Sequence, residues 1–190
     1  METWLARGFA AASLAWLALT GVVYLVVFVN GRRREHGWLA LQSLLAATYS
    51  LWVLDPSVAG ATTIGVLGGA LCVACAASVA FTHTHFGLPS PGRVWAILAG
   101  LGVVAGILTR VGWVPAHAMA AVTLLVIAAA LTHQIDSLRR LARTPTPSLN
   151  ARVLMAAWIV LALAIAVDVA SWLADLGAFG EPARLSASIV

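Results

Sequence analysis

The residue with the clearest chemical potential is Asp168, an acid inside the apolar stretch AIAVDVASW. A carboxyl group within a membrane is costly, so it usually faces a helix bundle and serves a function. Trp172 lies four residues further on and would share its helical face. An alternative interpretation stays open, in which Asp168 is solvated near the interface or is protonated and bonded to a neighbouring helix.

Several other polar and aromatic residues are expected at the same depth as Asp168. Together they predict an outward-opening pocket for a small ligand. The competing interpretation is an aromatic belt, because Trp and Tyr gather at membrane interfaces as anchors; for Trp172 we favour that belt. The candidate ligand-binding residues are Asp168, Trp172, Tyr49, Arg110, His117 and Trp16.

The five histidines raise the question of a haem site, because two imidazoles from facing helices can ligate haem iron. His36, His83, His85 and His133 are predicted at one membrane face, and only His117 at the other. With one haem at each membrane face, the haem at the face that has only His117 would therefore lack a second histidine ligand. One site that joins His83 or His85 to His133 stays open, but solvated histidines at loop edges are the favoured interpretation.

Cys72 and Cys75 form a CxxC pair, a spacing that elsewhere signals redox exchange or metal binding. Here they stand in an Ala-rich apolar stretch, where cysteine behaves as a small hydrophobe. We therefore predict no metal site, no cofactor and no catalytic residue, and the chain is not expected to be an enzyme. Close helix packing is the predicted role of six glycines: Gly65, Gly68, Gly69, Gly100, Gly102 and Gly106.

The elements that position these residues follow from composition. The chain has 190 residues, of which 62% are hydrophobic and 9% charged, with a mean hydropathy of +0.96. About a quarter of the residues of a soluble domain are charged, which excludes that class. All eleven basic residues are Arg and stand in a few clusters, so the net charge of +4 does not indicate nucleic-acid binding. The composition predicts an all-α polytopic membrane helix bundle.

A membrane-spanning helix needs about 20 apolar residues. We predict six such spans in a single transmembrane helical domain, residues 1–190, with Leu185 to Val190 as the possible start of a seventh. The first span is expected to be a permanent anchor rather than a removable signal peptide. The predicted spans are 8–30, 38–54, 60–82, 94–109, 116–131 and 153–173.

The arginines predict the orientation of these spans. Eight of the eleven fall in one set of alternating connections and three in the other. Cytoplasmic connections carry the excess of Arg in membrane proteins. The N-terminus is therefore predicted outside, in a multi-pass protein of a bacterial inner membrane.

One stretch, YLVVFVNGRRREHGWLALQSLLAATYSLW, resembles part of a bacterial seven-helix sensory domain family, the 7TM receptors with diverse intracellular signalling modules. The similarity lies in an apolar span that ends in aromatics, an Arg-rich hinge and an aromatic, Leu-rich restart, here Tyr24, Phe28, Arg32 to Arg34, Trp38, Leu39 and Tyr49. AFTHTHFGLPSP and LRRLARTPTPSLNARVLMAAW are similar in layout to the family's later inner loops. A full member of that family would add a seventh span and a cytoplasmic transmitter.

The resemblance implies a sensory module that detects a small ligand or membrane condition and relays it to a cytoplasmic signalling domain or partner. It transfers no residue role, because the family has no shared catalytic residue in the membrane. We expect the lipid bilayer, a small molecule and further copies of the chain as partners, and no nucleic acid. The alternatives are a stand-alone redox or transport protein, haem-based or proton-coupled through Asp168, and a membrane scaffold.

Overall fold

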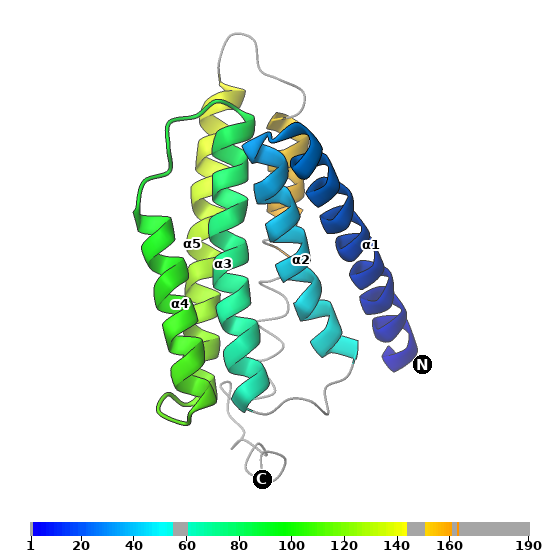
Figure 1. The fold of residues 1–190 in the computed structure, drawn as a ribbon, viewed down its shortest axis with the longest axis vertical. Helices are drawn as coiled ribbons and strands as arrows, with labels where there is room; N and C mark the ends of the chain where they lie inside the picture. Colours follow the sequence, from blue (N-terminus) through cyan, green and yellow to red (C-terminus); the bar gives the residue numbers. More distant parts are fainter. Residues whose placement is uncertain (1, 55–60, 144–150, 161–162, 164–190) are drawn as a thin grey trace. The chain divides into compact units, whose positions relative to one another are not determined.

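The described part of the chain is helical throughout. The computed structural model describes residues 2–54, 61–143, 151–160 and 163, and these ranges contain no strand. The all-α prediction is therefore confirmed for these residues. The helices are α1 (Glu2–Gly31), α2 (Arg34–Leu54), α3 (Ala61–His85), α4 (Val94–Arg110) and α5 (Ala116–Ala142), followed by the helix Ala151–Val160 (Figure 1).

The chain divides within α5 into two compact units, Met1–Ala130 and Leu131–Val190. In the first unit α1 packs on α2, α2 on α3 and α3 on α4, so neighbours in the chain are also neighbours in space. In the second unit Leu138 and Ala151 are among the buried residues. The prediction of a single domain for residues 1–190 stays a prediction.

Three helices contain stretches long and apolar enough to cross a membrane: Ala11–Gly31, Thr63–His85 and Ala116–Ala142. That finding supports a membrane protein. Among the described residues, however, it identifies three candidate spans, whereas six were predicted. α2 is long enough, but it begins with Arg34, Glu35 and His36 and is less apolar. α4 has only 17 residues. The predicted span 153–173 falls mostly outside the described residues, which include its first part within Ala151–Val160.

Several helices are longer than the apolar spans predicted within them, because hydropathy marks where apolar residues end and not where a helix ends. The largest difference concerns the span predicted to stop at Leu131, since α5 continues to Ala142. Asp136 and Arg140 stand at i and i+4 in this extension, and their side chains form an ion pair of 2.6 Å. Such pairs support a helix that has left the apolar region. α3 likewise ends at His85 instead of Thr82.

Backbone caps end the helices at their turns. After α3, Gly87 has φ +64° and donates its N–H to the carbonyl of Thr84, while Leu88 donates to the carbonyl of His83. This is the Schellman arrangement, which satisfies carbonyls that the last helical turn leaves open. α4 ends in the same way at Gly112. α1 ends differently, at the non-glycine residue Arg32, whose φ is 50° and whose N–H donates to Phe28 at 2.7 Å.

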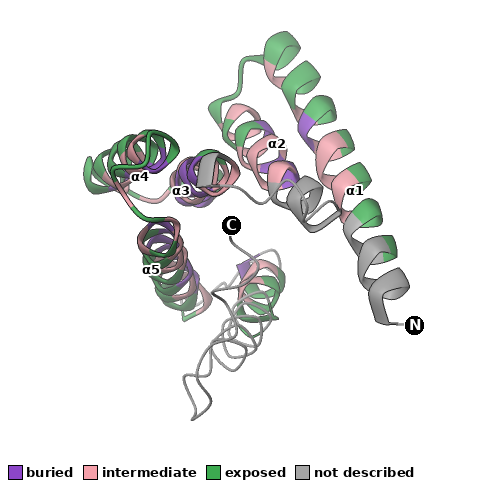
Figure 2. Cartoon of the chain, turned by 90° about the horizontal axis from the view of Figure 1, so that it is seen from below, coloured by how far each residue is buried: buried purple, intermediate pink, exposed green. Residues whose placement is uncertain are grey.

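The core of the first unit lies around α3 (Figure 2). Val79 of α3, Trp95 of α4 and Ala130 of α5 are buried together, with Cys75 and Leu98 packed against them. α3 and α4 meet through glycines at i and i+4 on each helix: a methyl group at Gly65 would overlap the carbonyl oxygen of Gly106, and one at Gly102 would overlap the Cβ of Cys72. Small residues let membrane helices approach this closely.

The glycine prediction is confirmed for five of its six residues. Gly68 lies against Met119 and Thr123 of α5, and Gly69 lies against Gly102. Gly100 is the exception, because a methyl group there would meet nothing within 4 Å. It stands on the exposed side of α4, because two residues turn a helix by about 200° and so place Gly100 opposite Gly102.

Candidate functional site

Polar contacts join two distant parts of the sequence where α2 begins and α3 ends. Glu35 is the second residue of α2, and its carboxylate accepts a hydrogen bond of 3.3 Å from Nδ1 of His85 near the end of α3. Arg33 approaches the other carboxylate oxygen of Glu35 at 3.8 Å. The Glu35 side chain is only 21% exposed, against 74% for Arg33, so the carboxylate is the more enclosed partner of that pair.

Two aromatic rings hold the imidazole of His85. The ring of Phe81, one helical turn earlier on α3, stacks on it with centroids 5.3 Å apart and planes at 20°. The ring of Phe86 meets it edge to face at 4.8 Å and 84°. Arg33, Glu35, Phe81, His85 and Phe86 are called the Glu35 cluster below. Its imidazole is therefore fixed by two rings and one carboxylate.

A second set of contacts closes the joint between α1 and α2. Tyr24 of α1 faces His36 of α2, with ring centroids 5.7 Å apart. Phe28 of α1 lies over Gly37, where a Cβ would stand 3.1 Å from the Phe28 ring. Any larger residue at position 37 would push that ring away. Nδ1 of His36 is buried and has no hydrogen-bond partner.

The caps described above position the cluster. The left-handed turn at Arg32 reverses the chain between α1 and α2 and so brings Glu35 toward α3. After α3, the Schellman turn at Gly87 leads into the 86–93 connection, where the ring of His83 donates from Nδ1 to the carbonyl oxygen of Pro89. His83 is buried, in contrast to the exposed His85. The two histidines, two residues apart, accordingly have different partners.

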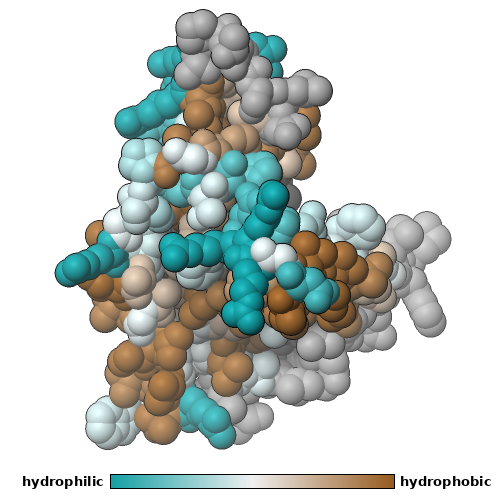
Figure 3. Space-filling model, turned by 45° about the horizontal axis from the view of Figure 1, so that its top comes forward, coloured by the Kyte–Doolittle hydropathy of each residue, from teal (hydrophilic) through white to brown (hydrophobic). Residues whose placement is uncertain are grey.

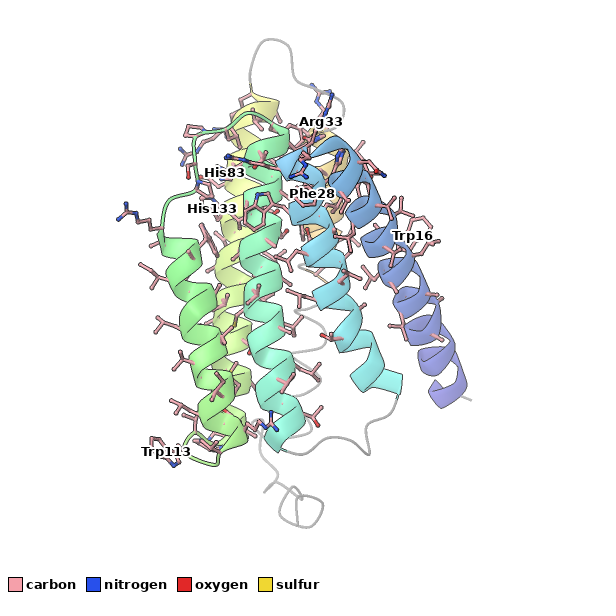
Figure 4. The ribbon with its side chains drawn as sticks, viewed as in Figure 1. Trp16, Phe28, Arg33, His83, Trp113 and His133 are labelled. Carbon is pink, nitrogen blue, oxygen red and sulfur yellow. The ribbon has the colours of Figure 1, made fainter. Side chains whose placement is uncertain are left out.

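Basic side chains gather at this end of the first unit. Arg32, Arg33, Arg34 and Arg93 are all exposed and stand in the two connections that meet here. Figure 3 shows hydrophilic residues gathered where these helix ends come forward, beside hydrophobic helix sides. Phe28, Arg33 and His83 lie at this end, whereas Trp113 lies at the turn between α4 and α5 at the opposite end (Figure 4). The arrangement gives one end a strongly positive surface around an enclosed carboxylate.

The predicted outer pocket is described only in part. Trp16 stands in the middle of α1 with 71% of its surface exposed (Figure 4), and Arg110 and His117 are exposed at opposite sides of the α4–α5 turn. α2 and α3 lie between α1 and α4 in the row of packed helices. Asp168 and Trp172 lie outside the described residues, and Tyr49 lies in α2 without a described side chain. The pocket stays a prediction.

The remaining candidates have structural partners. Cys72 and Cys75 are free cysteines of α3, and their described contacts are those of small packing residues at the α4 interface and the Val79 core. Within the described residues no group of three or more His, Cys, Asp or Glu side chains is placed to hold a metal ion. The Glu35 cluster joins polar side chains of α2 and α3 in the described part of the first unit.

Sequence reasoning found the neighbours of this cluster but missed its centre. The sequence pattern includes the Arg-rich hinge and the aromatics Tyr24 and Phe28, but it gives Glu35 no role. A signal was present, because Glu35 is the only acid in the connections that carry Arg32 to Arg34 and Arg93. Its partner His85 lies 50 residues away, a distance that no local pattern bridges.

Comparisons with protein-family models, with curated proteins and with solved structures find no match for this chain. Its function must therefore be argued from its own residues.

Proposed function

We propose that this chain is a membrane-embedded sensory module, which detects a small ligand or a membrane condition and relays it to a cytoplasmic signalling output. The observation that carries the proposal is the Glu35 cluster, which ties the α1–α2 joint to the end of α3. A helix that shifts in the membrane would change this tie, because Glu35 belongs to α2 and His85 to α3. The resemblance to seven-helix sensory domains points the same way.

The proposal includes six spans in a bacterial inner membrane with the N-terminus outside. Its support is the placement of Arg32, Arg33, Arg34 and Arg93 at one end of the first unit, since positive residues favour the cytoplasmic side. α2 and α4 then cross beside the three longer apolar helices. A bundle can accommodate short spans by tilt, by snorkelling side chains or by local thinning of the bilayer.

In this proposal the outer half of the bundle receives the signal. Asp168, Trp172, Tyr49, Arg110, His117 and Trp16 are the residues proposed to contact a ligand. The opposite end, with the Glu35 cluster, contacts the cytoplasmic partner. A homo-oligomer would let two copies transmit the change together, as expected of such modules.

The test uses the purified protein in lipid nanodiscs with spin labels at Arg34→Cys and Thr84→Cys, both exposed positions beside the Glu35 cluster. The background carries Cys72→Ala and Cys75→Ala. We expect at least one compound from a panel of amino acids, nucleotides and carboxylates to change the distance between the labels. Asp168→Asn should weaken that response.

The alternative, a stand-alone redox or transport protein, predicts different measurements. A Soret band in the purified protein, or proton flux into liposomes that Asp168→Asn abolishes, would overturn the sensory proposal. A response of the label distance without either activity would support it. A stable partner protein on detergent extraction, with no response of the labels to any compound, would favour the scaffold.

A further inference from the structure

The Glu35 cluster contains one imidazole, that of His85, beside a carboxylate. Imidazole is the one side chain whose ordinary titration lies between pH 5 and 8, whereas carboxyl groups ordinarily ionise below that window. His85 donates from Nδ1 to Glu35 at 3.3 Å, and 38% of its side chain is exposed. Protons can therefore reach the imidazole from solvent, and a gained proton would lie beside a carboxylate.

The charged groups around His85 favour one response to protonation. Glu35 faces it directly from α2, and Arg33 shares the same carboxylate at 3.8 Å from the exposed side. On its own helix and loop the ring contacts are Phe81 and Phe86, which are uncharged. The hydrogen bond to Glu35 would become charge-assisted in the protonated state, and such bonds are shorter and stronger than neutral ones.

Two other histidines at these helix ends are engaged differently. His36 faces Tyr24 across the α1–α2 joint, and His83 donates to the carbonyl oxygen of Pro89 within the connection after α3. These partners lie within the α1–α2 joint and within the connection after α3, whereas the imidazole of His85 on α3 meets a carboxylate of α2.

We propose that His85 and Glu35 form a proton-controlled latch, which holds the start of α2 against the end of α3 when His85 is protonated and releases it when His85 is neutral. The proposal rests on the proposed function, because it assigns a regulator to the same joint. It gives the module a response to pH at the face proposed to be cytoplasmic. The ring of Phe81, stacked on the imidazole, and the ring of Phe86, which meets it edge to face, pack against His85 beside the carboxylate.

The experiment measures the Arg34→Cys/Thr84→Cys label distance in nanodiscs at pH 8 and pH 5, without added compound. We expect the ratio of short-distance to long-distance populations to rise roughly two- to five-fold as pH falls, the effect that a partly exposed ion pair supplies. His85→Gln and Glu35→Gln should each abolish the response. Asp136→Asn, which removes an exposed carboxylate paired with Arg140 on α5, is the matched control and should keep it.

A variant that exchanges the two side chains tests whether the single variants lose the pH response merely because they fail to fold. The double variant Glu35→His with His85→Glu restores one imidazole and one carboxylate, and it should recover a rise of the short-distance population toward pH 5. A distance ratio that does not change with pH in the parent protein would overturn the latch, as would a change that survives in both single variants.

The outcome separates the latch from the sensory proposal. If a compound changes the label distance at fixed pH while the pH series is flat, the latch is wrong and the sensory function stands. If the pH series responds as expected but the protein carries an Asp168-dependent proton flux, the latch stands and the sensory function is wrong.

Discussion

α1 and α3 have the same mean hydropathy over their most apolar stretches, 2.2, yet they are packed in opposite ways. Only 6% of the apolar stretch of α1 is buried inside the protein, against 44% of that of α3. The difference is one of side-chain size. α1 carries large residues on its exposed side, including Leu19, Val22, Val26 and Val29, whereas α3 is rich in Gly, Ala, Ser and Cys.

The comparison teaches that hydropathy and packing are separate properties in a membrane. Lipid tails are as apolar as Leu or Val, so burial against another helix gains little from the hydrophobic effect. Helices associate there through close approach, which small residues permit. Within the first unit, α1 is an edge helix whose exposed apolar side chains are suited to lipid, while α3 contacts α2, α4 and the first part of α5.

The largest expected effect on stability distinguishes the closest packing contact of α3 from that of α1. Gly65→Ala on α3 places a methyl group against backbone, the carbonyl oxygen of Gly106, and we expect a loss of about 3 kcal/mol, the upper end of overpacking costs. Gly21→Ala on α1 meets chiefly the side chain of Leu44, which can move, with the Leu44 backbone N at 3.2 Å, and it should cost less. Unfolding in mixed detergent micelles measures both variants.

A matched control for that pair is Gly100→Ala, which meets nothing within 4 Å and should stabilise α4 by about 0.5–1 kcal/mol because Ala favours helix. Equal losses at Gly65 and Gly100 would show that close α3–α4 approach does not hold the first unit together.

A middle-sized effect is expected from added volume at Val79 and Val22. Val79 of α3 is fully buried beside Trp95 and Ala130, so Val79→Phe should destabilise the protein by about 2 kcal/mol through overpacking. Val22 of α1 is 52% exposed, and Val22→Phe should leave the thermal midpoint within error of the parent. A large loss from Val22→Phe would mean that this side of α1 is packed against protein.

The smallest effects concern the ends of the two helices. Arg32 after α1 holds a left-handed φ of 50°, which costs a residue with a Cβ about 1–2 kcal/mol, so Arg32→Gly should stabilise the protein by about 1 kcal/mol. Gly87 after α3 has φ +64°, and Gly87→Ala should destabilise it by about the same amount. Thermal unfolding that moves both variants in one direction would contradict this account of the caps.

Much of the fold was predictable because its cause is local. Apolar runs located all five labelled helices, and the glycines predicted to pack closely include those at the α3–α4 contact. The differences have a common reason: α5 continues eleven residues past Leu131 because Asp136 and Arg140 support a polar helix that hydropathy does not register. The packing prediction for Gly100 was wrong for a similar reason, because the rotation of α4 about its axis decides which of its glycines faces a neighbouring helix.

The site was harder to predict than the fold. The Arg-rich hinge, Tyr24 and Phe28 form a recognisable sequence pattern. Glu35, by contrast, is identified as a site residue only from the folded structure, in which α3 brings His85 beside it. The Asp168 hypothesis rests on one residue in an apolar run, and its neighbours in space depend on how distant helices pack. Sequence patterns specify helices well and pairs of helices poorly, because packing depends on side-chain size on each face.

The most direct test of the account is the collision rate of spin labels with oxygen, which concentrates in the lipid interior, in nanodiscs. Labels replace Val22 and Val26 on α1, and Ala74 and Ala77 on α3, in the background without native cysteines. The account predicts high rates at both α1 positions and low rates at both α3 positions. Equally low rates on α1 and α3 would contradict it, because α1 would then be enclosed by protein rather than by lipid.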